Sequence, residues 1–283
     1  MMGGALRAEV RKLSAMSWSW LAVLGMNAFS AAMFLLFVLV WARSTALDDA
    51  ARASVDMARQ AGGILSFVFL TETWAFSVLG VFFLGLLVGE LVGKELSEGS
   101  AALTVLSPAS RTQVLVAKLV AVFLVYAMAL ALSLSLQGAT VLILSRVHPI
   151  FLDVLDGGVL ARILAAHVLI DLSWITLLFF FSTLSSGAAS TLAYTAGFWI
   201  VSLTADAAVF LGTQFSFLGP WTAAAGRYTF TATCRVLEAG QLRRYLFEQG
   251  APFPLSLDLL GVNFLYALLF LGLALAVFRR RDI

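Results

Sequence analysis

The chain has 283 residues, of which 61% are hydrophobic and 12% are charged, and its formal net charge is +2. A soluble domain carries about twice this charged fraction, so the composition excludes an ordinary soluble globular protein and indicates that lipid solvates much of the surface. The small and scattered positive charge does not indicate a nucleic-acid partner. The single cysteine, Cys234, excludes an intrachain disulfide framework and a cysteine-rich metal site.

Residues 1–17 are expected to form an amphipathic helix that lies at the membrane surface. Leu6, Val10 and Leu13 recur at helical spacing and are opposed by charged residues, so the basic side chains would face anionic headgroups. The alternative is an ordinary positive flank that fixes the topology of the first span. The apolar stretch that follows is too long for a cleavable signal and predicts a retained span.

Six apolar stretches are long enough to cross a bilayer, which takes about 20 residues per helix. They predict an all-α polytopic membrane protein with a single transmembrane domain, residues 1–283. The third stretch is overlong and is expected to tilt, break or extend beyond the lipid. A Ser/Gly turn at 184–187 predicts that the fourth and fifth spans form an antiparallel hairpin. The spans run approximately over residues 18–41, 64–88, 114–144, 159–181, 188–211 and 255–278.

An even number of spans places both termini on the same side of the membrane. The lysines and arginines divide evenly between the two sides, but the long loops, which count less in the positive-inside rule, all fall on the non-terminal side. All three lysines and the cluster Arg279-Arg280-Arg281 lie on the terminal side. We therefore expect a multi-pass protein of the cell inner (plasma) membrane with both termini in the cytoplasm.

A short polar segment between the second and third spans carries the most specific signal. In order along the chain it holds an acidic residue, a Gly-Ser pair, several aliphatic residues, a proline, an arginine and a lysine. Charged residues frame the aliphatic ones, so a short helix here would present an apolar ridge to a groove on a soluble partner. The alternative is a solvated loop whose leucines dip into the membrane interface. The residues are Glu95, Glu98, Gly99, Ser100, Leu103, Leu106, Pro108, Arg111 and Lys118.

This order of residues resembles the segment after the second membrane helix in permease subunits of the six-helix, type-2 class of ABC exporters (the type V exporter fold). Ser100 stands where the family pattern has threonine and keeps the hydroxyl. The C-terminal run from Phe278 to Ile283, with its arginines and aspartate, also resembles the way many of these permeases end. The resemblance implies an N-terminal elbow helix, a coupling helix over 95–111, a second permease copy (identical or related), and two separate ABC ATPase subunits that bind ATP and Mg.

No nucleotide-binding motif occurs in the chain, although the stretch from Gly89 to Glu95 superficially resembles a P-loop. It has one residue too few between its glycines, and Glu95 stands where a serine or threonine must ligate magnesium. The stretch is better interpreted with Gly85, Gly89 and Gly93, a small-residue stripe that lets another helix approach closely. The alternative is that this stripe faces lipid. We expect no catalysis by this chain itself.

Ionisable residues inside predicted spans are costly and are therefore candidate functional groups. His167 and Asp171 lie one turn apart in the fourth span, while Glu72 and Asp206 lie in the outer parts of the second and fifth. They predict either a polar substrate path or a structural network, such as a His167–Asp171 pair. Two other functions stay open: an ABC-linked device that transmits force to an extracytoplasmic partner without cargo, and an ATP-independent intramembrane enzyme or proton-coupled carrier that uses His167 and Asp171.

Overall fold

The computed structural model describes residues 2–45, 80–98, 110–147, 157–214, 219, 226–235 and 257–280. All the secondary structure in these ranges is helical. In chain order the helices are α1 (Met2–Ala15), α2 (Ser17–Thr45), α5 (Val81–Val88), the π-helix η2 (Gly89–Lys94), α6 (Glu95–Ser97), α8 (Arg111–Val147), α9 (Gly157–Leu184), α10 (Ala188–Gln214), α12 (Phe230–Arg235) and α14 (Leu257–Arg280).

Five of these helices are long and apolar enough to cross a membrane. Their candidate spans are Ser17–Leu36, Arg111–Thr140, Leu164–Leu184, Ala188–Gly212 and Leu257–Arg280. These spans overlap the first, third, fourth, fifth and sixth stretches predicted from the sequence. Most of the predicted second span, 64–88, lies outside the described residues, which include its last part as α5. None of the described helices contains a proline, as expected because proline breaks a helix interior.

The third predicted span forms a single helix, α8, of 37 residues. At about 1.5 Å per residue it is roughly 55 Å long, whereas the hydrocarbon core of a bilayer is about 30 Å thick. Of the expected ways to accommodate an overlong span, a break does not occur, and the helix must therefore tilt or extend beyond the lipid. The fourth and fifth spans form the predicted hairpin, with residues 185–187 as the tight turn between α9 and α10.

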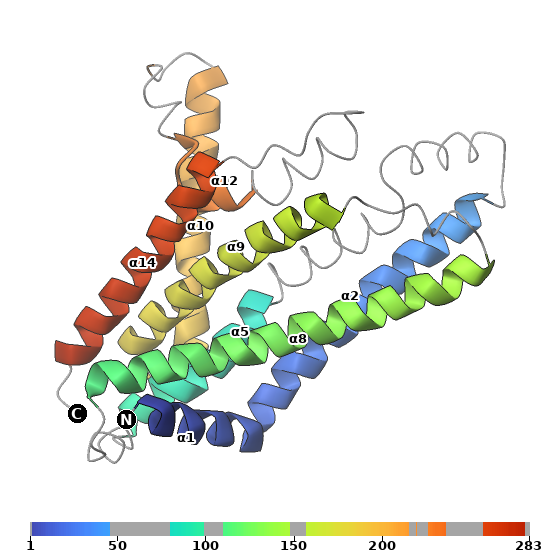
Figure 1. Cartoon of the computed structure of the whole chain (residues 1–283). Coiled ribbons are helices and arrows are strands. Elements are labelled where there is room, and N and C mark those ends of the chain that lie inside the picture. Colours follow the sequence, from blue (N-terminus) through green and yellow to red (C-terminus); the bar gives the residue numbers. More distant parts are fainter. Residues whose placement is uncertain are drawn as a thin grey trace.

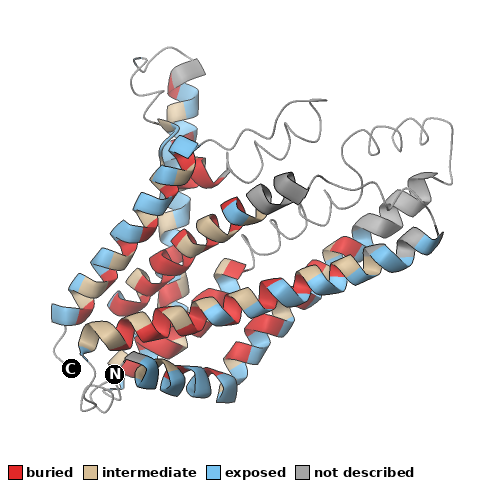
Figure 2. Cartoon of the chain, viewed as in Figure 1, coloured by how far each residue is buried: buried red, intermediate tan, exposed pale blue. Residues whose placement is uncertain are grey.

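The helices pack as two groups with α5 and η2 between them. In the first group α1 and α2 pack on α8, and in the second α10, α12 and α14 pack around α9, with α14 and α9 in contact along much of their length. Buried side chains follow the inner faces where the helices meet (Figure 2). Polar groups join α2 to α8 inside the span, where Asn27 donates to the carbonyl of Ala129 (3.2 Å) and Ser133 donates to Ser30 (3.1 Å).

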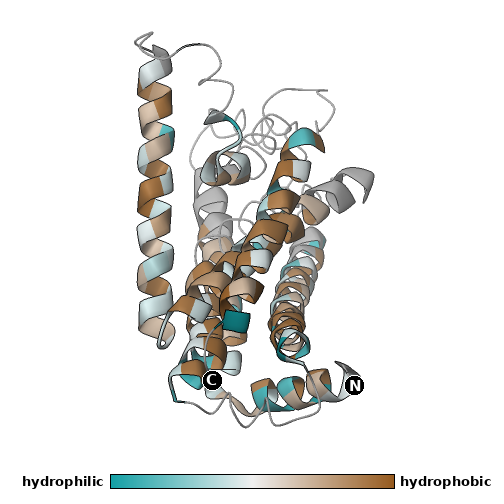
Figure 3. Ribbon diagram, turned by 90° about the vertical axis from the view of Figure 1, so that its left-hand side faces the viewer, coloured by the Kyte–Doolittle hydropathy of each residue, from teal (hydrophilic) through white to brown (hydrophobic). Residues whose placement is uncertain are grey.

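Helix α1 lies across the end of the bundle, where the C-terminal end of α14 also lies (Figures 1 and 3). The helix ends at Ala15, and the N–H of the next residue, Met16, donates to the carbonyls of Lys12 and Leu13. One of the charged residues expected on the polar face of this helix is misplaced. Glu9 is buried, because an ionic partner on α8 faces it, whereas Leu13 is buried and Val10 is 40% exposed on the apolar face.

Helix α10 is the least covered of the candidate spans, since only 11% of its most apolar window is buried within the chain. Figure 3 shows it standing apart from the bundle along most of its length. Exposed apolar side chains on it, including Trp199, Ile200 and Phe210, would be unfavourable in water. In a bilayer the same side chains face lipid at no such cost.

Candidate functional site

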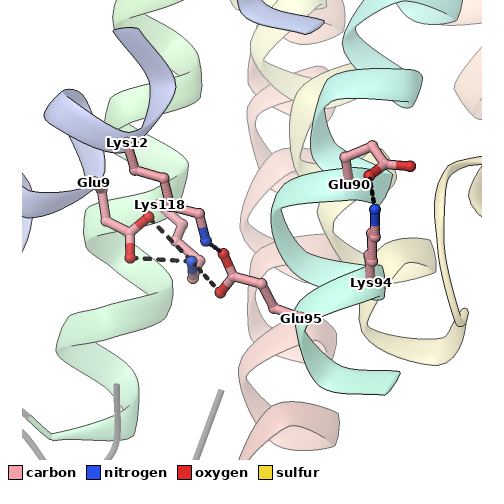
Figure 4. Close-up of polar contacts among 6 residues, drawn as sticks. All are labelled: Glu9, Lys12, Glu90, Lys94, Glu95 and Lys118. Carbon is pink, nitrogen blue, oxygen red and sulfur yellow. Dashed lines mark hydrogen bonds and ion pairs between the residues drawn. The ribbon is translucent and has the colours of Figure 1, made fainter. Parts of the chain in front are cut away.

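A buried ionic network joins α1, α6 and α8 at the end of the bundle where α1 lies (Figure 4). The ammonium of Lys118 on α8 lies between two carboxylates, 3.0 Å from either oxygen of Glu9 and 2.8 Å from Oε2 of Glu95. Lys12 on α1 pairs with the other oxygen of Glu95. We call Glu9, Lys12, Glu95 and Lys118 the ionic network.

Three members of the ionic network are almost fully excluded from solvent. Lys118 is 3% exposed, Glu9 5% and Glu95 8%, whereas the side chain of Lys12 is 42% exposed. Partial burial lowers the pKa of Lys12, the nearby charge of Lys118 lowers this pKa further, and Glu9 opposes both. Buried charges of this kind are tolerated only when they are paired and hydrogen-bonded. The network therefore fixes the position of the segment that begins at Glu95 relative to α1 and α8.

A lysine close to the start of a span, as Lys118 is, would ordinarily reach back to the membrane surface. Its side chain instead extends to the carboxylates of the ionic network, where two carboxylates compensate the buried ammonium. Sequence reasoning also assigned Glu9 to the exposed face of α1. A helical wheel could have shown otherwise, because Glu9 lies on the same stripe as Leu6 and Leu13.

The remaining residues of the predicted coupling segment differ in accessibility. Glu98 is exposed and is the last described residue before 99–109. Arg111 is half-buried at the start of α8, and its guanidinium donates to the carbonyl of Arg279 on α14 (3.3 Å). Arg279 donates in turn to the hydroxyl of Thr112 (2.9 Å). Five predicted residues lie outside the described part of the chain: Gly99, Ser100, Leu103, Leu106 and Pro108.

The stripe of Gly85, Gly89 and Gly93 packs against the α9–α10 turn and the beginning of α10. A Cβ atom on Gly89 would lie 2.4 Å from the Cα of Ala188, and one on Gly93 would lie 2.7 Å from the hydroxyl of Ser185. At the N-terminal end of the stripe the neighbour is a side chain, since a Cβ on Gly85 would lie 2.6 Å from a methyl group of Leu192. All three glycines are buried within the chain, which is incompatible with a stripe that faces lipid.

The stretch from Gly89 to Lys94 is a π-helix rather than a loop. Such wide turns are uncommon and occur frequently at functional sites. On its exposed side Lys94 pairs with Glu90 at 3.2 Å, and this hydrogen bond and the negative charge raise the pKa of Lys94. The hydroxyl of Ser97, just beyond the π-helix, donates to the carbonyl of Ser186 in the α9–α10 turn (3.0 Å). The predicted coupling segment therefore contacts the hairpin of α9 and α10 as well as the ionic network.

A second polar cluster lies inside the candidate spans. Nε2 of His167 lies 3.2 Å from Oδ2 of Asp171 on the same helix, α9, so the pair predicted from the sequence is present. The hydroxyl of Tyr126 on α8 donates to the same carboxylate oxygen (2.5 Å). Sequence reasoning missed Tyr126, because nothing in the chain marks which residue of α8 opposes Asp171.

Asp206 on α10 anchors the short helix α12. It accepts hydrogen bonds from the hydroxyls of Thr229 (2.5 Å) and Thr231 (2.6 Å). Phe230 between them packs its ring edge-on against Trp174 of α9 at 4.8 Å between centroids. These contacts favour a structural role for Asp206 over a place in a substrate path. Glu72, the fourth predicted intramembrane residue, lies outside the described residues.

Within the described parts of the chain, no three or more His, Cys, Asp or Glu side chains come together to hold a metal ion. No protein-family model matches the sequence, and no curated protein matches it.

Proposed function

We propose that this chain is the permease subunit of an ATP-driven ABC exporter, with six spans and the second formed by residues 64–88. The ordered match at Glu95, Gly99, Pro108, Arg111 and Lys118 carries the proposal. Five apolar helices of spanning length support it. A second support is that one end of the bundle brings together α1, the residues on either side of 99–109 and the end of α14. In this arrangement that end faces the cytoplasm of the cell and two separate ATPase subunits, and a second permease copy completes the path for an unidentified substrate.

The contacts of the segment's two flanks suggest how force would enter the membrane helices. Glu95, on the first flank, is held through Lys118 to α8 and through Lys12 to α1. Arg111, on the second flank, bonds to the backbone of α14. A push on residues 95–111 by a closing pair of ATPase subunits would therefore reach both helix groups at once. The same arrangement would serve mechanotransmission to an extracytoplasmic partner, and transport assays in vesicles with the ATPase subunit separate these two outcomes, because only an exporter moves cargo.

Charge reversal at Glu98, which is exposed, and at Arg111, which is half-buried, tests docking without removing a member of the ionic network. Glu98→Lys and Arg111→Glu should each reduce co-purification of the proposed ATPase subunit by about tenfold, because one lost interfacial charge pair costs on the order of 1.4 kcal/mol. ATP turnover of the assembled complex should fall in parallel. The matched control is Arg146→Glu, which reverses an exposed charge at the opposite end of α8. Unchanged recruitment and turnover in both test variants would contradict the docking assignment.

The proposed orientation can be tested with introduced thiols. Cys234 is a poor reporter because it is only 4% exposed and its sulfur accepts a hydrogen bond from Asn263. In a Cys234→Ala background, an impermeant maleimide applied to intact cells should label Arg146→Cys, and should label Glu98→Cys only after the membrane is permeabilised. Labelling of Glu98→Cys from outside, with Arg146→Cys protected, would invert the topology.

A further inference from the structure

The cluster of Tyr126, Asp171 and His167 has no part in the proposed docking of an ATPase, yet its placement is unusual. All three side chains are at least 95% buried, with exposed fractions of 1%, 3% and 5%. They lie within candidate spans of α8 and α9, where an uncompensated charge costs at least about 2.5 kcal/mol. A carboxyl group and an imidazole at 3.2 Å in such a place must be close to neutral as a pair.

Neutrality of the pair requires one shared proton. With that proton present, the pair is either imidazolium and carboxylate or imidazole and carboxylic acid, and both forms have zero net charge. Loss of the proton leaves a carboxylate whose remaining bond in the cluster is the one from the Tyr126 hydroxyl. Histidine is the side chain that proteins most often use as a pH-sensitive group.

The cluster also lies at a joint of the fold. Tyr126 belongs to α8, which packs on α1 and α2, whereas Asp171 and His167 belong to α9, which packs on α10 and α14. The hydrogen bond from Tyr126 to Asp171 therefore connects the two helix groups inside the membrane. Hydration would lower the free-energy cost of an unneutralised carboxylate at this joint. Separation of the two helix groups would let water reach it.

Several other ionisable groups on the helices that pack against α9 are engaged elsewhere. Glu90 and Lys94 of η2 pair with each other, and Asp206 of α10 accepts from Thr229 and Thr231. Tyr266 of α14 donates to the carbonyl of Tyr228. On α8, Lys118 belongs to the ionic network and Arg111 to the contact with Arg279. Tyr126 and His167 are the groups whose hydrogen bond and charge act on Asp171.

We propose that Tyr126, Asp171 and His167 form a proton-binding site between the two helix groups, and that loss of its proton moves α8 away from α9. This site operates without ATP and does not depend on the proposed docking of an ATPase. It gives the chain a pH-dependent conformational equilibrium, with the closed joint at low pH and the open joint at high pH.

The test measures the distance between α8 and α9 by electron spin resonance on the full chain in nanodiscs of zwitterionic lipid. Spin labels are attached at Leu124→Cys on α8 and Ala165→Cys on α9, both exposed positions, in a Cys234→Ala background. The distance should increase by about 2 Å, the amplitude typical of helix shifts, when the pH rises from 5.5 to 8.5. Asp171→Asn, which keeps an acceptor for Tyr126 but binds no shared proton, should hold the short distance at both pH values.

The second histidine of the chain supplies a matched control, because His148→Gln removes the other imidazole of the chain. The response should persist in His148→Gln and disappear in His167→Gln. This comparison decides the question even if Asp171→Asn does not fold. A distance that is the same at both pH values in the unsubstituted protein would overturn the proposal, as would a response that survives in His167→Gln or vanishes in His148→Gln.

Discussion

Lys118→Met should lower the free energy of unfolding by about 3–5 kcal/mol, the usual cost of removing one partner from a buried ion pair. Glu9 and Glu95 would stay buried, and Glu9 would lose the cation that contacts both of its oxygens. Lys12 would still reach Glu95 but is too exposed to replace a buried ammonium. Equilibrium unfolding of the purified protein in mixed micelles, with helix content as the signal, measures the change. Because α1 and α6 would lose their common anchor on α8, ATPase stimulation should be lost as well.

Two comparisons make the result specific to the buried charges. Lys94→Met removes a lysine from the exposed pair with Glu90 and should change stability little, since exposed pairs contribute little. Adding Glu9→Gln to Lys118→Met should recover much of the loss, because the uncompensated carboxylate is then gone. If Lys118→Met were no more destabilising than Lys94→Met, the ionic network would not be the anchor described above.

Gly89→Leu should separate η2 from the beginning of α10 and destabilise the protein by at least about 1–3 kcal/mol, the usual cost of overpacking. The obstacle is backbone rather than a movable side chain, since even a Cβ atom would lie 2.4 Å from the Cα of Ala188 and 2.9 Å from its nitrogen. The protein should show a lower thermal midpoint. Because η2 leads directly into Glu95, ATP hydrolysis by the proposed ATPase subunits should continue without the coupled activity of the helices.

Gly138→Leu is the matched control, because Gly138 lies within a candidate span and a Cβ there has no neighbour within 4 Å. Gly89→Ala should already show part of the defect, since the clash begins at Cβ. Unchanged stability and unchanged coupling for Gly89→Leu would mean that the close approach of the two backbones has no mechanical role.

The spans could be predicted from the sequence because solvation by lipid is a local requirement. Each helix must supply its own run of about 20 apolar residues, whatever it packs against. The tight turn between the fourth and fifth spans was predicted for a similar reason. Serine and glycine are typical turn residues, and too few residues separate the two apolar stretches for a longer connection. The pair of His167 and Asp171 also follows from spacing, because residues four apart on a helix lie on the same face.

The partners of the charged residues could not be predicted, because they depend on which helix faces are brought together. Lys118 and Glu9 are separated by 109 positions, and Tyr126 and Asp171 by 45. Several polar residues along α8 were equally eligible partners for Asp171 when only the sequence was considered. The role of Glu95 changed for the same reason, since its position in a polar segment indicated an exposed contact while its cations on α1 and α8 hold it inside.

The ionic network has a consequence for the way the protein responds to membrane voltage. Two carboxylates and two ammonium groups cancel, and the neighbouring pair of Glu90 and Lys94 cancels too. A unit charge carried across a membrane at 100 mV gains or loses about 2.3 kcal/mol, but a set of groups with zero net charge that moves together does no such electrical work. A displacement that carries all four groups of the ionic network together therefore adds no electrical work of its own, in a polarised cell as in a depolarised vesicle.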